Sequence, residues 1–292
     1  MINRQGMKKI KEYKYAEIKY DRDRALLSWK IKSEGIPNFS LEGLKEFKQI
    51  VEDLRIFFDD SSNPIKYVVS LSEYPGVYNL GGDLPFFFES IKTQNRAALK
   101  EYAYLCIDAI YNIYTSFGLP GLSIALVEGN AYGGGFECAL AHDVVLASEE
   151  AKFCLPENKF NLFPGMGAYS FLCRKLNVKK AIEFLYSDKA YNAKELLEFG
   201  LIDELITDNT EAVLEQFIAK TESKFNFIYC HYQSIKKVFP LQKEELLEIT
   251  DIWVDACLNM TEKDLRRMQL IINAQHRKLR QKVKENNLKE IV

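Results

Sequence analysis

Apolar residues alternate with polar ones near the start of the chain and then recur every three or four positions. Residues 14–20 and 24–31 carry the alternating pattern, with the turn-forming "DRD" between them, which predicts a β-hairpin. From Phe39 to Phe58 the apolar spacing is helical, and Ser40 stands where an N-cap is expected. The chain is therefore predicted to begin with two strands and a long amphipathic helix.

After that first helix, short apolar runs alternate with stretches of helical spacing. Buried strands are predicted at 65–72, 122–129, 143–148, 151–157 and 201–206. Helices are predicted from Leu84 to about Phe117 with a break near Thr93–Arg96, from Gly134 onward, and as two or three elements over 168–199. The last of these begins at Asn192, a favoured N-cap residue, and ends before Gly200, a residue that commonly terminates helices.

Repeated strand–helix–strand units followed by a helical final third indicate an α/β fold with a helical appendage. Almost everything after Asp208 has a helical pattern. We therefore expect an α/β core with the active site over residues 1–208. Residues 209–292 are expected to form a helical region that covers the pocket and supports oligomerisation.

Composition narrows the classes of protein that need to be considered. The chain has 292 residues, 47% of them hydrophobic, and a formal net charge of −2, so nothing in the overall charge favours nucleic acid or a membrane surface. Its six cysteines are scattered without metal-ligand spacing, which fits a reducing cytosol. The charged start lacks the apolar segment of a signal peptide, and no run reaches membrane-spanning length. A cytoplasmic protein without metal or cofactor is expected.

Three consecutive glycines follow the predicted strand 122–129 in "GNAYGGGFE". No Gly-Lys-Ser/Thr follows, so this is not a phosphate-binding P-loop, and the spacing does not match a dinucleotide-binding fingerprint. Tight strand-to-helix packing and close approach of a ligand both remain open for this motif alone.

A second glycine turn, "YNLGGDLPFF", follows the predicted strand 65–72 and also precedes a helix. Glycine lets a backbone approach a ligand closely, and the first N–H groups of a helix have no internal partner. Two such N–H groups that converge on one point would form an oxyanion hole for a carbonyl oxygen.

Two glutamates lie in apolar surroundings close to these turns. Glu137 follows the glycine triplet, and Glu157 follows Pro156 near the end of a predicted strand. A buried carboxylate is unfavourable unless it is partnered, has a raised pKa or transfers protons. Either glutamate alone could be structural, but the pair beside two glycine turns favours catalysis.

The stretch "AYGGGFECALAHDVVLASEEAKFCLPE" resembles the signature region of the enoyl-CoA hydratase/isomerase (crotonase) superfamily, and the order of motifs is similar over about residues 14–206. The resemblance implies a repeated β-β-α spiral core, with C-terminal helices that build homotrimers or hexamers. It assigns the oxyanion N–H groups to Gly82 and Gly134 and the catalytic carboxyls to Glu137 and Glu157. Because both glutamates are present, hydration or dehydration of an acyl thioester is implied.

A narrower resemblance is carried by "NLGGDLPFF" and "LPENKFNLFPGMGAYSFL". These strings are similar to the diffusible-signal-factor synthases of quorum sensing, a crotonase branch with dehydratase and thioesterase activity. The resemblance implies a 3-hydroxyacyl chain on acyl carrier protein (ACP), a free cis-2-unsaturated fatty acid as product, and a sensor receiver domain as a partner. Asp143 departs from that branch and is interpreted as structural.

The carrier is a second point on which the chain departs from ordinary hydratases. The loop "SEGIPNFSLEG" lacks the pattern with which those enzymes commonly hold CoA, so ACP is favoured over CoA. An ordinary enoyl-CoA hydratase/isomerase of fatty-acid metabolism remains the alternative function.

Apolar residues beside the predicted site offer a slot for the acyl chain. Individually each is more typical of core packing, but their positions next to the first oxyanion turn and after Glu157 predict substrate contact for some of them. The candidates are Leu84, Phe86, Phe87, Phe88, Phe163 and Met166.

The segment 261–286 is predicted as a long helix with one apolar and one basic face. Its apolar stripe must be buried on the chain itself or on another subunit, and consists of Leu265, Met268, Ile272, Leu279 and Val283. The basic face is either solvated or attracts an acidic carrier or CoA phosphates, and consists of Arg266, Arg267, Arg277, Lys278, Arg280, Lys282 and Lys284. RNA binding or a purely regulatory role for the crotonase fold stays open as another class, disfavoured by the acidic balance and by the two glutamates.

Overall fold

The predicted hairpin is present at the start of the fold. The computed structural model describes residues 7–32, 35, 37–72, 74–207 and 209–289. β2 (Ala16–Asp21) pairs antiparallel with β3 (Leu26–Ile31), and β1 (Met7–Lys9), which the pattern did not indicate, pairs with the outer edge of β2. In the turn, the Arg24 N–H donates to Asp21 Oδ1 at 3.2 Å.

Helix α1 (Leu41–Asp59) begins where the sequence predicts. The Ser40 hydroxyl caps it by accepting from the Gly43 N–H at 3.2 Å. Its apolar face packs into the main core beside α3 (Arg96–Tyr114), so the helix is stabilised by burial along one side. The break predicted before α3 is also present, because Asn95 caps α3 after α2 (Leu84–Lys92) has ended.

A seven-stranded sheet forms the base of the fold, in the order β1-β2-β3-β4-β6-β8-β11. Its parallel part consists of β3, β4 (Tyr67–Ser70), β6 (Leu122–Val127), β8 (Val144–Ser148) and β11 (Glu204–Ile206). Helices cover both faces of these strands, which explains why they are continuous apolar runs in the sequence.

A second, four-stranded sheet has the order β10-β9-β7-β5 and corrects one sequence prediction. Its strands are β5 (Val77–Asn79), β7 (Asn130–Tyr132), β9 (Lys152–Cys154) and β10 (Tyr191–Asn192). The runs 65–72 and 122–129 were each predicted as one strand leading into a glycine turn. In the structure β4 and β6 end earlier, and the glycine turns follow β5 and β7 of the second sheet.

The two sheets arise from a repeated β-β-α unit, as the resemblance implied. Each unit places one strand in each sheet and then a helix: β4–β5–α2/α3, β6–β7–α4 and β8–β9 followed by η2 and α5. The remaining helices before the C-terminal region are η1 (Ser116–Gly118), α4 (Gly134–Leu140), η2 (Glu157–Phe160), α5 (Ala168–Lys175), α6 (Val178–Tyr186) and α7 (Ala193–Glu198). Asn192 and Glu195 form the capping box of α7, and Gly200 beyond its end has a φ of +73°. The predicted fold class is confirmed.

The C-terminal helices pack onto the core rather than forming a separate body. They are α8 (Thr210–Glu222), α9 (Phe225–Val238), α10 (Lys243–Leu258) and α11 (Glu262–Lys289). α8 covers the face of the main sheet opposite α1, and α10 runs along α3. None of the helices in the described part of the chain is both long and apolar enough to cross a membrane.

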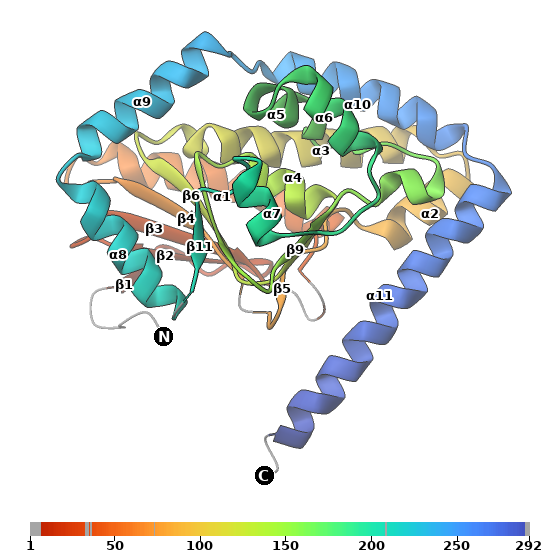
Figure 1. Cartoon of the computed structure of the whole chain (residues 1–292), viewed down its shortest axis with the longest axis horizontal. Helices are drawn as coiled ribbons and strands as arrows, with labels where there is room; N and C mark the ends of the chain where they lie inside the picture. The colour runs from red at the N-terminus through yellow and green to blue at the C-terminus, as the bar shows by residue number, and fades with distance from the viewer. Residues whose placement is uncertain (1–6, 33–34, 36, 73, 208, 290–292) are drawn as a thin grey trace.

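Helix α11 starts against the core and then extends away from it (Figure 1). Met268 and Ile272 of its predicted apolar stripe are buried within the chain itself. Further along α11, the structure does not describe the side chains of six residues that the sequence analysis named. They are Leu279 and Val283 of the stripe and Lys278, Arg280, Lys282 and Lys284 of the predicted basic face. The part of the stripe that can be followed is therefore used for intramolecular packing.

Candidate active site

The two glycine turns meet because their strands are neighbours. β5 pairs in parallel with β7, with Val77 opposite Asn130, so the segments that follow both strands leave the sheet side by side. Gly81 has a φ of +82°, and a β-carbon there would lie 2.6 Å from the backbone nitrogen of Gly134. Only glycine allows this approach at this φ. The predicted convergence is therefore present in the structure.

The first turn is held on two sides. The Gly81 N–H donates to the Asn79 side chain at 2.6 Å, while the Gly81 carbonyl accepts from the Phe39 N–H at 2.8 Å. Beyond Gly82, the Asp83 N–H donates to the Tyr102 hydroxyl at 3.0 Å. These contacts fix the orientation of the peptide between Gly81 and Gly82.

Two backbone N–H groups are available at the meeting point. Gly134 is the first residue of α4, where the helix supplies no acceptor. Within the described part of the chain, neither the Gly82 N–H nor the Gly134 N–H has a hydrogen-bond acceptor, and both residues line one cavity. A negatively polarised oxygen is the chemical group that such a pair would bind.

Glu137 lies in the first turn of α4 and is 1% exposed. Its Oε1 accepts from the Met166 N–H at 2.8 Å and from the Ala168 N–H at 2.9 Å. Burial raises the pKa of this carboxyl into the neutral range, while the two N–H donors oppose that shift because they favour the charged form.

Glu157 opens η2 and lies three residues beyond β9, because the strand predicted over 151–157 ends at Cys154. Its Oε1 lies over Gly133, where a β-carbon would be 2.7 Å from that oxygen. Its Oε2 is buried and has no hydrogen-bond partner among the described residues. Burial, and secondarily the charge of Glu137, raise the pKa of Glu157 above its ordinary value.

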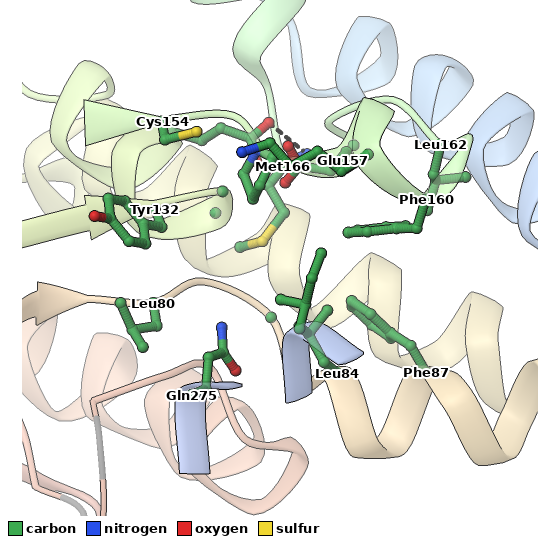
Figure 2. Close-up of a pocket in the computed structure, with 18 of the residues that line it drawn as sticks. Leu80, Leu84, Phe87, Tyr132, Cys154, Glu157, Phe160, Leu162, Met166 and Gln275 are labelled. Atoms are coloured by element: carbon green, nitrogen blue, oxygen red, sulfur yellow. Dashed lines mark hydrogen bonds between the residues drawn. The ribbon is translucent and has the colours of Figure 1, made fainter. Parts of the chain in front are cut away.

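Both glutamates and both glycines line a cavity of about 490 Å³. Figure 2 shows Met166 and Glu157 on one side of the cavity, with Leu80, Leu84 and Gln275 across from them. The sulfur of Met166 lies so close to Gly134 that a β-carbon on this glycine would be 2.3 Å from it. The thioether therefore occupies the space directly above the second turn.

The predicted acyl-slot residues separate into two groups. Leu84, Phe87 and Met166 line the cavity. The structure places the other three elsewhere, because they pack on protein instead: Phe86 stacks on Tyr102, Phe88 lies against the main core, and Phe163 packs edge-on to Tyr169. Within the described structure these three do not belong to the cavity wall.

Several lining residues come from the C-terminal helices, which were expected to cover the pocket but in which no lining residue was predicted. Trp253 of α10 packs on Phe87 with ring centroids 5.0 Å apart, and α11 adds Ile271, Ala274 and Gln275. The helical pattern predicted the helices that carry them, but nothing in a helix pattern tells which core it will meet. These four residues are the part of the cavity wall that the C-terminal region contributes.

Asp143 lies away from the cavity in a buried polar cluster. Its Oδ2 accepts from the Ser123 N–H and hydroxyl at 3.0 and 2.9 Å, and its Oδ1 pairs with Lys236 at 2.7 Å. These contacts join β6 to α9, so Asp143 stabilises the packing of these two elements. Among the described residues, no three His, Cys, Asp or Glu side chains are grouped as metal ligands.

The fold and the paired turns define a crotonase-type site, and the family comparison agrees. Residues 38–279 match the enoyl-CoA hydratase/isomerase family model, and the chain belongs to this family. The superfamily resemblance seen in the sequence is thereby confirmed.

Particular relatives extend this result. The fatty acid oxidation complex subunit alpha of Pseudomonas savastanoi pv. phaseolicola is 29% identical over 180 residues, covering 62% of this chain and 24% of that protein. The corresponding subunit of Pseudomonas putida strain GB-1 matches to the same extent. The chain thus spans about a quarter of the length of these relatives.

Solved structures share the fold at lower identity. An enoyl-CoA hydratase from Bacillus halodurans has a TM-score of 0.74 at 22% identity, covering 88% of this chain and 100% of that one. The human mitochondrial delta3-delta2-enoyl-CoA isomerase has a TM-score of 0.73 at 16% identity, covering 91% and 99%. Pseudomonas aeruginosa DspI has a TM-score of 0.66 at 22% identity, covering 84% and 96%.

Proposed function

We propose that the protein adds water to, or removes it from, an acyl thioester, with Glu137 and Glu157 as the acid–base pair. The observation that supports this best is the presence in one cavity of two carboxyls whose pKa values are raised by burial, beside two unpaired N–H groups. Such an arrangement provides charge stabilisation and proton transfer at the same place.

The oxyanion hole would be formed by the N–H groups of Gly82 and Gly134. A thioester carbonyl oxygen between them becomes more negative as the enolate develops, and the two donors are already oriented. Polarisation of the carbonyl acidifies the C2 protons of a 3-hydroxyacyl chain and makes C3 of a 2-enoyl chain electrophilic.

The surroundings of the two glutamates give them different protonation states at neutral pH. Glu137 has two N–H donors that stabilise its charge, whereas Oε2 of Glu157 is buried without a partner. The single negative charge of the pair therefore resides on Glu137, while Glu157 keeps its proton.

This distribution suits hydration directly. Glu137 takes a proton from the attacking water as its oxygen bonds to C3, and Glu157 gives its proton to C2 as the enolate collapses. Dehydration runs the same steps backward and starts from the opposite distribution of the proton: ionised Glu157 accepts the C2 proton, and protonated Glu137 gives its proton to the departing hydroxyl. Each glutamate thus ends a turnover with the opposite protonation, and proton exchange through water restores the pair.

For the carrier and the product, we propose 3-hydroxyacyl-ACP as the substrate and a free cis-2-unsaturated fatty acid, a diffusible signal factor, as the product. Support comes from the "LFPGMGAYSFL" resemblance and from the missing CoA-loop pattern, of which residues 33, 34 and 36 lie outside the described structure. Release of the acid is compatible with the same site, because the oxyanion hole would also stabilise the tetrahedral intermediate of thioester hydrolysis.

An ordinary enoyl-CoA hydratase of fatty-acid metabolism is the second candidate. It is favoured by the similarity to fatty acid oxidation complex alpha subunits.

For either function we propose that the protein forms a homotrimer or hexamer, since the family resemblance implies one. Sedimentation velocity measures the size of the assembly. The receiver-domain partner is a proposal from the same narrower resemblance.

The acid–base assignment is tested with Glu137→Gln and Glu157→Gln, with Glu150→Gln at an exposed position as the matched control. Turnover is measured with crotonyl-CoA and with 3-hydroxydecanoyl-ACP. Each active-site variant should lose at least ~10²-fold in turnover, because a positioned acid or base contributes ~10²–10⁴-fold. Turnover within about threefold of the wild type for either variant would contradict the assignment.

The carrier is tested by mass spectrometry of free fatty acids from cells that express the protein or its Glu137→Gln variant. Release of cis-2-unsaturated acids only by the unmodified protein supports the signal-synthase proposal. If no free acid appears and purified protein hydrates crotonyl-CoA with kcat/KM of ~10⁴–10⁸ M⁻¹s⁻¹, the ordinary hydratase is the better description.

A further inference from the structure

The turn that carries Glu157 is connected to α11 by a side-chain hydrogen bond. Asn161 Nδ2 donates to Asp264 Oδ2 at 3.2 Å. The two residues are far apart in sequence, and each lies at an end of its element: Asn161 follows η2, and Asp264 lies in the first turn of α11. The contact therefore joins the end of one element to the beginning of another.

Asn161 closes the turn through its backbone as well. It adopts the left-handed conformation with φ 61° and ψ 37°, which asparagine tolerates better than most residues. Its N–H donates to the Asn158 carbonyl at 3.1 Å, and the next N–H, of Leu162, donates to the Glu157 carbonyl at 3.1 Å. The conformation of Asn161 thus determines where the Glu157 backbone is held.

Asp264 is a firmly held acceptor. It is 5% exposed, and its Oδ2 also accepts from the Thr261 N–H at 3.0 Å and from the Thr261 hydroxyl at 2.7 Å. These bonds cap the first turn of α11 and fix the carboxylate relative to the helix axis. The hydrogen bond to Asp264 therefore holds Asn161 at a fixed position relative to α11.

The same helix supplies a wall of the cavity through Ile271, Ala274 and Gln275, and Gln275 lies across the cavity from Glu157 (Figure 2). We propose that Asn161 and Asp264 are positioning residues that set the Glu157 carboxyl at a fixed place relative to the α11 wall. This inference rests on the proposed role of Glu157 and extends it to residues outside the cavity. Neither residue touches the substrate.

The test uses the full-length protein and four variants. Asn161→Gly removes the side-chain amide but keeps a residue that readily adopts positive φ, and Asp264→Ala removes the carboxylate acceptor. Asp264→Asn keeps an acceptor oxygen and should rescue, while Lys263→Ala, at an exposed position in the first turn of the same helix, is the matched control. Amide hydrogen exchange of the segment 157–162 is measured by mass spectrometry, together with kcat, KM and the pH profile of hydration.

We expect Asn161→Gly and Asp264→Ala to speed exchange in this segment and to lower kcat about tenfold with KM within about threefold, since a small misplacement of a catalytic group acts on the chemical step. The pKa of the alkaline limb should move, while Asp264→Asn and Lys263→Ala should behave like the wild type. Unchanged exchange in both deletion variants overturns the inference whatever the activity. If Glu157→Gln is fully active the proposed function fails, whereas an inactive Glu157→Gln with unaffected Asn161→Gly defeats the positioning role alone.

Discussion

A β-carbon on Gly81 would stand 2.6 Å from the backbone nitrogen of Gly134 and 2.9 Å from the Tyr132 carbonyl oxygen. Two segments separated by a complete β-β-α repeat are therefore in direct backbone contact. This contact sets the separation between the N–H groups of Gly82 and Gly134. Gly82 directly follows Gly81, and the backbone nitrogen of Gly134 is itself one of the contacting atoms. The geometry of the proposed oxyanion hole thus depends on a residue that does not itself donate to the substrate.

Gly81→Ala should abolish most activity. The new methyl group requires both a left-handed conformation, which is unfavourable by roughly 1 kcal/mol, and a displacement of the Gly134 backbone. We expect kcat/KM to fall at least ~10²-fold, the effect of losing one oxyanion donor. Gly35→Ala, where a β-carbon would meet no atom within 4 Å, is the control, and circular dichroism monitors folding. A folded Gly81→Ala protein with normal kcat/KM would contradict this account.

The pH dependence of hydration should form a bell shifted to high pH. On the acid side activity falls as Glu137 becomes protonated, and on the alkaline side it falls as Glu157 loses its proton. Since burial raises the pKa of both groups, both limbs should lie well above the ordinary glutamate pKa of about 4.3. The profile of kcat/KM measures this, with far-UV circular dichroism over the same range to exclude unfolding. An acid limb near the ordinary value would show that Glu137 is not the base.

Glu157→Gln should stabilise the protein at alkaline pH. A carboxyl whose pKa is raised on folding contributes stability that is fully present below its unfolded pKa and is lost as pH rises through its folded pKa. The wild type therefore loses free energy of unfolding progressively between the ordinary carboxyl pKa of about 4.3 and the raised pKa of about 8 in the folded protein, and the amide variant escapes this part of the loss. In urea denaturation at about pH 9 we expect a gain of ~1 kcal/mol. At about pH 5 the two proteins should be similar. No gain at high pH would mean that Glu157 ionises without penalty.

Trp253→Leu should shift the acyl preference toward longer chains. The indole packs on Phe87, a β-carbon on Gly165 would lie 2.5 Å from it, and the ring is part of the cavity wall. A smaller side chain leaves space for additional methylenes, each worth about 0.8 kcal/mol when buried. Relative kcat/KM for chains of increasing length measures the shift. Ile252→Ala, at the exposed neighbouring position, should keep the original preference, and an unchanged order in Trp253→Leu would refute the prediction.

The long apolar runs and the two glycine turns were predictable because their patterns are local. The strands that carry the turns were not: β5 and β7 have three residues each, too few for any periodicity to appear. Their existence depends on pairing with each other and with β9, a long-range interaction that single-sequence patterns do not contain. The glycines were therefore recognised correctly but assigned to the ends of the wrong strands.

The acyl-slot predictions show a second limit. Leu84 and Phe87 are three positions apart in α2 and share a helix face, which is the face on the cavity. Phe86 is about 100° of helix rotation away from Phe87 and about 160° away from Leu84, so the same period could have separated it. Phe88 is four positions after Leu84, which is a same-face spacing, so the period alone could not have excluded it. Trp253 and Gln275 could not be found in this way, because their approach to the site follows from how α10 and α11 dock.

The place of α11 in the order of synthesis has a further consequence. Ile271, Ala274 and Gln275 are translated after the glycine turns and both glutamates, and after every other residue that lines the cavity. On the ribosome, the β-β-α units can assemble while this wall is still missing, and the growing chain then exposes an open apolar trough. Nascent protein would be exposed to adventitious hydrophobic ligands and chaperones until α11 docks, so the maturation of the cavity depends on the docking of this helix rather than on the folding of the glycine turns alone.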